Sequence, residues 1–183
     1  MKMMKDDIER TLITNDEIVA KTKEIAALMS KDFEGEEIIM VCILRGSCMF
    51  FGELVKNIPN YIELEFITVN SYKGTTSSGE VRMISDITRP IENKNVIVVE
   101  DIIDTGYTLN YLKKILLARN PKCLKIATLL DKPVRREVEL KGDYVGFEIP
   151  NEFVVGFGLD YKQKYRNYPH IGILKPEVYK QEK

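Results

Sequence analysis

The sequence contains few of the residues on which metal, disulfide and histidine-based sites depend. Its 183 residues include no tryptophan, one histidine and three cysteines. We expect His170 to be structural, because a single histidine argues against histidine-based catalysis and against a His-rich metal site. Cys42, Cys48 and Cys123 show no C-x-x-C spacing and are odd in number, which favours reduced thiols in a packed interior over disulfides or zinc.

An excess of either charge is missing, and so are long apolar runs. Lys and Arg number 27 against 28 Asp and Glu, so no basic excess attracts nucleic acid or anionic membranes. The apolar stretches have the length of strands, and the N-terminal segment MKMMKDDIER is too charged for the core of a signal peptide. We therefore expect a cytoplasmic protein without a nucleic-acid or membrane partner.

Two common phosphate-binding patterns, the P-loop and G-x-G-x-x-G after a strand, are absent too. What the chain has instead is VIVVEDIIDTGYT at 96–108, an apolar run followed by three carboxylates and a hydroxyl-rich loop around one glycine. The apolar half predicts a strand buried on both faces, 96–99. Its carboxylates then lie beyond the carboxyl end of the strand, where open α/β sheets bind their ligands.

The loop at 104–108 opens onto a predicted helix. Leucines recur at helical spacing, at Leu109, Leu112, Leu116 and Leu117, until Pro121 closes the segment. A helix N-terminus favours an anion, but the carboxylates beside it repel a phosphate unless a divalent cation, sugar hydroxyls or a developing carbocation lies between. The ligand implied is a phosphorylated ribose with Mg²⁺.

Elsewhere, strands and helices alternate, which predicts an α/β fold with a parallel sheet. We expect one domain, 1–183, with a core at about 35–135. A smaller subdomain, the hood, would be formed by the N-terminal segment and about 136–183. The predicted helices are 14–33, with a Thr14–Glu17 capping box and Leu28 on its buried face, and 49–58. The remaining predicted strands are 38–44, 61–70, 81–87 and 125–130 in the core, and 144–149 and 153–157 in the hood.

The segment VVEDIIDTGYT resembles the phosphoribosyl-diphosphate motif of the type I phosphoribosyltransferases. Leu44-Arg45-Gly46, the Ser71-Tyr72 loop, Asp131-Lys132-Pro133 and VGFEIPNEFVVGFGLDYKQKYRN resemble the hypoxanthine-guanine branch of that family, in order along most of the chain. The resemblance implies a parallel-sheet core flanked by helices, with a small hood. It also implies a reaction in which a purine base attacks C1 of phosphoribosyl diphosphate, releasing pyrophosphate and forming a nucleoside 5'-monophosphate.

The resemblance assigns the motif residues to the activated sugar. Asp104 would accept the proton at purine N7, and the alternative is that it merely caps the helix that follows. Glu100 and Asp101 would meet the ribose and Mg²⁺. The 5'-phosphate would lie in a cup formed by Thr105, Gly106, Tyr107 and Thr108. The sequence leaves open whether Tyr107 contributes its amide or its ring.

Pyrophosphate would contact Arg45, Gly46 and Arg166. The resembled family often has lysine where Arg45 stands, and often a cis peptide in this loop; without the resemblance, Arg45 is a surface residue. The polar segment 71–79 is by itself a solvated hairpin. The resemblance makes it a lid, closed through Ser71 and Tyr72, which would keep water from a cationic sugar.

The purine would lie against Lys132, Phe153, Val154 and Asp160. Lys132 would donate to the 6-oxo group of the purine. The alternative is that its side chain extends to solvent and has no role in binding. Phe153 would stack on the base, although an aromatic residue in a strand is by itself more often core. Backbone groups near Val154 would meet the base edge, and Asp160 would hold a second Mg²⁺ or an exocyclic group.

Two other functions fit parts of the sequence. An RNA-binding regulator built on the same fold is one, and a nucleotide hydrolase is the other; Asp104, Lys132 and the two arginines favour the transferase over both. The expected substrates are phosphoribosyl diphosphate and 6-oxopurine bases, with hypoxanthine, guanine and xanthine left unranked. We expect a homodimer or homotetramer, as the resembled family commonly forms.

Overall fold

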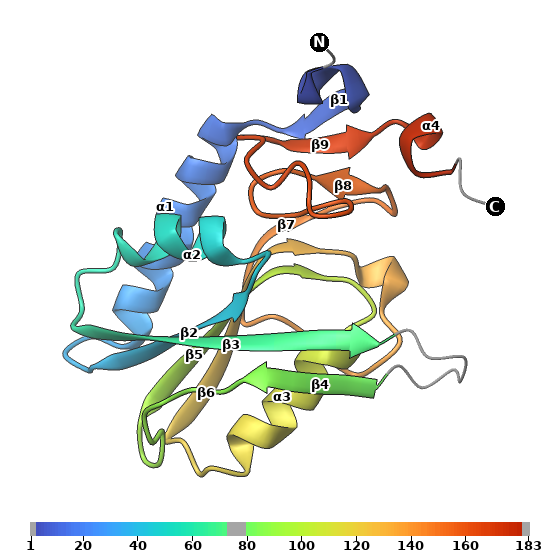
Figure 1. Cartoon of the computed structure of the whole chain (residues 1–183). Coiled ribbons are helices and arrows are strands. Elements are labelled where there is room, and N and C mark those ends of the chain that lie inside the picture. The colour runs from blue at the N-terminus through green and yellow to red at the C-terminus, as the bar shows by residue number, and fades with distance from the viewer. Residues whose placement is uncertain (1–2, 73–79, 181–183) are drawn as a thin grey trace.

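The computed structural model describes residues 3–72 and 80–180 and contains two sheets (Figure 1). The larger has six strands in the order β4-β3-β2-β5-β6-β7, and all its pairings are parallel except that of β3 with β4. The strands are β2 (Ile38–Leu44), β3 (Ile62–Tyr72), β4 (Glu80–Ser85), β5 (Asn95–Ile103), β6 (Cys123–Asp131) and β7 (Tyr144–Glu148). The expected α/β fold with a parallel-sheet core is confirmed.

Helices cover both faces of this sheet, because alternate residues of its central strands are apolar on both sides. Met40 of β2 packs in the cluster that contains α1 (Asn15–Asp32) and α2 (Cys48–Val55). Its neighbour Val41 packs in a second cluster, against α3 (Tyr107–Leu117). Figure 1 shows α1 and α2 together and α3 on the opposite side.

The smaller sheet joins the two ends of the chain. It has the order β1-β9-β8 and is antiparallel, so β1 (Ile8–Ile13) lies beside β9 (Ile171–Leu174), which pairs with β8 (Val154–Val155). Three short helices complete the fold: the 3₁₀ turns η1 (Met4–Asp7) and η2 (Pro133–Arg135), and the α-helix α4 (Pro176–Tyr179). None of the helices among the described residues is long and apolar enough to cross a membrane.

Local signals at the start of α1 are confirmed. The Thr14 amide donates to Glu17 Oε2 at 2.8 Å, and the Glu17 amide donates to Thr14 Oγ1 at 3.3 Å, which completes the capping box. His170 accepts the Asn15 amide proton at Nδ1, with an N–N distance of 2.9 Å. The histidine is therefore structural, as expected.

Three expectations about elements are wrong. The segment 144–149 is not part of the hood, because β7 pairs with β6 as the sixth strand of the main sheet. Ser71 and Tyr72 end β3 instead of opening a loop. Leu28 is 56% exposed, because it lies at the edge of the buried stripe of its helix. The boundary of the hood itself stays a prediction.

Candidate active site

Two of the motif carboxylates, Glu100 and Asp101, belong to β5, which continues to Ile103 instead of ending at Val99 as expected. The strand is long because β6 pairs with it throughout, and Glu100 lies opposite Thr128. Glu100 and Asp101 therefore lie in the last part of a central strand. They line a cavity of about 370 Å³.

This cavity brings together most of the predicted sugar and pyrophosphate residues. Besides the two strand carboxylates, its wall includes Arg45 and Gly46 after β2, and Asp160 and Arg166 from the segment between β8 and β9. The motif loop contributes Asp104, Thr105, Gly106 and Thr108. Residues far apart in the sequence meet here because the carboxyl ends of parallel strands share one edge of the sheet.

Glu100 and Asp101 hold like charges close together in a desolvated position. Burial, reinforced by the charge of Asp101, raises the pKa of Glu100 well above its ordinary value. Burial also raises the pKa of Asp101. Within the described residues no group of three His, Cys, Asp or Glu side chains forms a ready metal site. Two carboxylates that repel each other suit Mg²⁺, which takes one or two protein carboxylates and completes its shell with substrate oxygens and water.

The phosphate cup has the expected backbone. Gly106 adopts φ +90°, a conformation that L side chains rarely take, and is the N-cap from which α3 begins at Tyr107. The Tyr107 side chain is 51% exposed, and a hydrogen bond with Glu137 raises its pKa. The ring thus turns away from the cavity, so only its backbone is placed at the cup.

The turn after β2 is packed against the carboxylates. The Leu44–Arg45 peptide bond is cis, as the resemblance implied. A Cβ on Gly46 would lie 1.7 Å from Asp101 Oδ2, and one on Gly158 would lie 1.9 Å from the Gly46 carbonyl oxygen. Glycine is therefore required at both positions, since a methyl group has no space there.

The two arginines are held by the hood. Arg166 donates from Nη1 to the Gly158 carbonyl at 2.7 Å and pairs through Nη2 with Asp160 Oδ1 at 2.7 Å. Arg45 is exposed, and its Nη1 lies 3.4 Å from Gln163 Oε1. Arg166 Nη2 also donates to Gln163 Oε1 at 3.1 Å, so the Gln163 side chain lies between the two guanidinium groups. Guanidinium groups match the geometry of phosphate oxygens.

Asp104 has partners that the sequence interpretation missed. Its Oδ1 accepts from Arg135 Nε at 3.0 Å, and its carbonyl accepts from Arg136 Nη1 at 2.6 Å. Arg136 also pairs with Asp131, so it joins the end of β6 to the motif loop. Asp104 is not a helix cap, because α3 is capped by Gly106 without a side-chain bond. The sequence did contain a signal for these contacts, the adjacent basic residues Arg135 and Arg136 shortly after Lys132-Pro133.

Lys132 is buried at 7% exposure and does not snorkel. Its Nζ donates to the Glu152 carbonyl at 2.7 Å, directly before Phe153, and burial lowers the pKa of Lys132. Phe153 is 37% exposed, while Val154 is buried in β8, which leaves only its backbone for a base. These three residues lie beside the sugar cavity and not in its wall.

The predicted lid lies largely outside the described residues. Ser71 and Tyr72 end β3 in register with Val81 and Glu80, but their side chains lie outside the described residues, as does the whole of 73–79.

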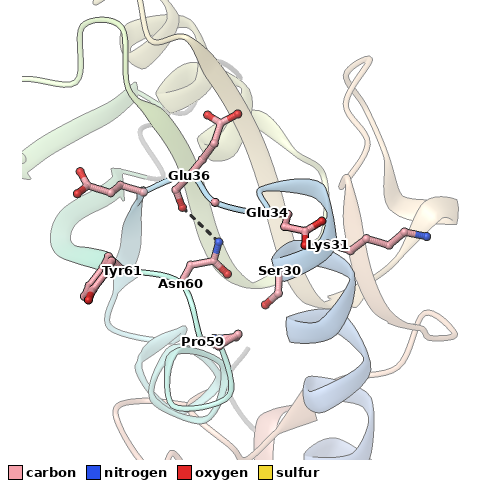
Figure 2. A pocket seen from close by; sticks show the side chains of 9 residues that line it. Ser30, Lys31, Glu34, Glu36, Pro59, Asn60 and Tyr61 are labelled. Atoms are coloured by element: carbon pink, nitrogen blue, oxygen red, sulfur yellow. Dashed lines mark hydrogen bonds between the residues drawn. The ribbon is translucent and has the colours of Figure 1, made fainter.

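A second, larger cavity of about 700 Å³ lies away from the motif (Figure 2). It is lined by the end of α1, the turn at 34–37 and residues 59–61, which precede β3. Figure 2 shows the Asn60 amide pointing to Glu36, and Asn60 Nδ2 donates to the Phe33 and Glu36 carbonyls at 2.7 and 3.2 Å. Asn60 thus joins two turns, a structural role.

Comparisons with known proteins identify the family of the chain. A family model described as a phosphoribosyl transferase domain matches residues 11–162. A hypoxanthine-guanine phosphoribosyltransferase of Lactococcus lactis is 53% identical over 173 residues, 94% of each chain. One of Streptococcus thermophilus is 48% identical, covering 97% of this chain and 99% of the relative. The structure of a hypoxanthine phosphoribosyltransferase of Staphylococcus aureus has 46% identity and a TM-score of 0.94, covering 97% of both chains.

The fold and the family model define a type I phosphoribosyltransferase, in which strand carboxylates and the loop around Gly106 lie together in one cavity. Within that class, the chain belongs to the hypoxanthine-guanine phosphoribosyltransferases, pentosyl-transferring enzymes of purine salvage. The RNA-binding alternative finds no support among these relatives, which are named as enzymes.

Proposed function

We propose that the chain transfers the 5-phosphoribosyl group of phosphoribosyl diphosphate to hypoxanthine, and to guanine, giving IMP or GMP and pyrophosphate. The observation that carries the proposal is the single cavity that joins two strand carboxylates, an amide-lined cup and two arginines. These groups match the ribose, the 5'-phosphate and the diphosphate of one substrate.

In this proposal the cup at 105–108 binds the 5'-phosphate, and Arg45, Gly46 and Arg166 bind the pyrophosphate. Mg²⁺ is the proposed cofactor, held by Glu100 and Asp101, with Asp160 as a second position. Burial raises the pKa of both carboxylates, and the charge of Asp101 adds to the rise at Glu100. A bound cation would offset both effects, which supports this assignment. When bound, the ion neutralises charge on the diphosphate.

The purine is proposed to lie between the cup and the hood. The C1–oxygen bond to pyrophosphate breaks, the C1–nitrogen bond to the base forms, and Asp104 accepts the proton at N7. Lys132 donates to the 6-oxo group, so a base with an amino group there leaves a buried donor unpaired. Phe153 stacks on the ring, backbone groups at Val154 meet its edge, and Ser71 and Tyr72 close the lid.

We also propose a cytoplasmic homo-oligomer, at least a dimer. Cys42, Cys48 and Cys123 are all unpaired, which fits a reducing compartment. Leu64 on β3 is 46% exposed, and Ile84 on the neighbouring edge strand β4 is 55% exposed. Phe66, also on β3, is 44% exposed. These three residues, the β3–β4 apolar patch, provide a surface for a second copy.

The test is ultraviolet monitoring of nucleotide formation from phosphoribosyl diphosphate with each purine in turn, with and without Mg²⁺. We expect synthesis with hypoxanthine and guanine, little with adenine, and loss of synthesis when Mg²⁺ is chelated. Equal rates with adenine would contradict the role of Lys132. Release of ribose 5-phosphate without nucleotide would instead indicate a hydrolase.

A further inference from the structure

Phe153 is part of a cluster of three aromatic rings that the C-terminal helix completes. The ring of Tyr179, the last residue of α4, stacks on Phe153 with a centroid distance of 4.7 Å and an interplanar angle of 17°. Tyr161 meets Phe153 edge-on, at 5.6 Å and 88°. Both are favourable aromatic geometries, so two neighbours fix the orientation of the Phe153 ring.

The position of Phe153 relative to Lys132 is fixed by backbone contacts. Lys132 Nζ donates to the carbonyl of Glu152, the preceding residue, at 2.7 Å. The Leu174 amide donates to the Phe153 carbonyl at 2.9 Å and attaches it to β9. The charge of Asp104 also acts on Lys132. A base held by Lys132 and Asp104 therefore lies within reach of the Phe153 ring.

Part of that ring is left open to a base. Tyr179 stacks on one face, yet Phe153 is still 37% exposed. A phenyl ring held from behind can stack without first losing rotational freedom, so the support lowers the entropic cost of binding.

Tyr179 is itself anchored to the opposite end of the chain. Lys175, which precedes α4, donates from its amide to the Asp7 carbonyl at 3.0 Å and from Nζ to the Asp6 carbonyl at 2.7 Å. Tyr179 also packs against the cluster that contains Val155 and Leu174. The support behind Phe153 is therefore built from both chain termini.

We infer that Tyr179 is a positioning residue for the purine, which backs Phe153 and thereby raises the affinity for the base without touching it. The inference rests on the proposed function, because it needs Phe153 to stack on a purine. The C-terminal helix α4 would thus contribute to binding of the purine and not to binding of phosphoribosyl diphosphate.

The test compares Tyr179→Leu and Tyr179→Phe in the full-length protein, with Tyr111→Leu, a 38% exposed tyrosine on α3, as the matched control. We expect Tyr179→Leu to raise KM for hypoxanthine about 2- to 10-fold, the range expected for one aromatic stacking pair. KM for phosphoribosyl diphosphate and kcat should stay within about twofold, because the sugar cavity lies elsewhere. Tyr179→Phe should restore the wild-type KM, and Tyr111→Leu should leave it unchanged.

An unchanged KM for hypoxanthine in Tyr179→Leu would overturn the inference, and so would equal changes for both substrates or failure of Tyr179→Phe to rescue. A lower KM would mean that Tyr179 occupies the base's place. If the wild-type chain makes no nucleotide, the proposed function is wrong and the inference falls with it; activity with an unchanged KM refutes the inference alone.

Discussion

At the scale of single residues, the site is held by ion pairs that cross between segments. Asp104 contacts Arg135 through its side chain and Arg136 through its carbonyl. These contacts keep the carboxylate beside Lys132 before any substrate arrives. A carboxylate held in place in this way needs little reorganisation when it accepts a proton.

We predict that Asp104→Asn lowers kcat by about 10² to 10⁴, the usual contribution of a general acid or base. The fold should survive, because Asp104 is 42% exposed and surface ion pairs contribute little to stability. Steady-state kinetics and thermal melting measure the two effects. The matched control is Asp86→Asn, which removes an ion pair with Arg119 outside the cavity; unchanged turnover in Asp104→Asn would remove it from the mechanism.

The lowered pKa of Lys132 predicts a dependence on pH. Burial makes the ammonium lose its proton at a lower pH than in the unfolded chain. The unfolded chain then binds more protons between the two pKa values, so this residue's contribution to stability rises with pH there. Binding of the 6-oxo group should weaken over the same range, because the donor loses its charge.

Comparison with Lys132→Arg isolates this effect, since arginine stays charged. We expect the ratio of the wild-type KM for hypoxanthine to that of Lys132→Arg to rise between about pH 7 and about pH 10. Ionisation of the substrate cancels in the ratio. A ratio that is constant over this range would show that the charge of Lys132 plays no part.

At the scale of elements, the site depends on close packing of turns from different parts of the sheet. The turn after β2 fits against Asp101 of β5 only because Gly46 has no side chain, and the hood fits against that turn only because Gly158 has none. Glycine at these two positions follows from contacts between segments, since neither neighbour is local in sequence.

We predict that Gly46→Ala destabilises the protein by about 1–3 kcal/mol and lowers activity, because the new methyl group displaces Asp101. Gly52→Ala is the matched control, since nothing lies within 4 Å of its Cβ inside α2. That control should stabilise by about 0.5–1 kcal/mol. Chemical denaturation and kinetics measure both, and wild-type behaviour of Gly46→Ala would contradict the contact.

At the scale of the whole molecule, the exposed β3–β4 apolar patch requires an explanation. Val69 and Met83 pack on the α3 side of the sheet, so the alternation of strands places Leu64, Phe66 and Ile84 on the other face. An exposed apolar patch of this kind near the edge of a sheet favours association with another chain.

We predict that Leu64→Glu combined with Ile84→Glu converts the oligomer to a smaller species, because both charges would be buried in the interface. Sedimentation or light scattering measures the mass. Leu117→Glu, at a comparably exposed leucine on α3, should leave the mass unchanged. A monomeric wild-type protein, or a double variant with the wild-type mass, would show that this face is not the interface.

The sequence by itself determined the central strands, the Thr14 capping box and the motif loop, because their signals are local: apolar runs, cap spacing and a glycine with positive φ. It also placed Arg45, Glu100, Asp104 and Arg166 in one site, through the resemblance to a family.

Only the tertiary structure decided the rest. It assigned β7 to the main sheet, turned the Tyr107 ring away, buried Lys132, and brought Arg135 to Asp104 and Tyr179 to Phe153. Each depends on residues distant in the chain: a five-residue strand has no periodicity that names its partner, and a side chain's contacts depend on which segment folds against it.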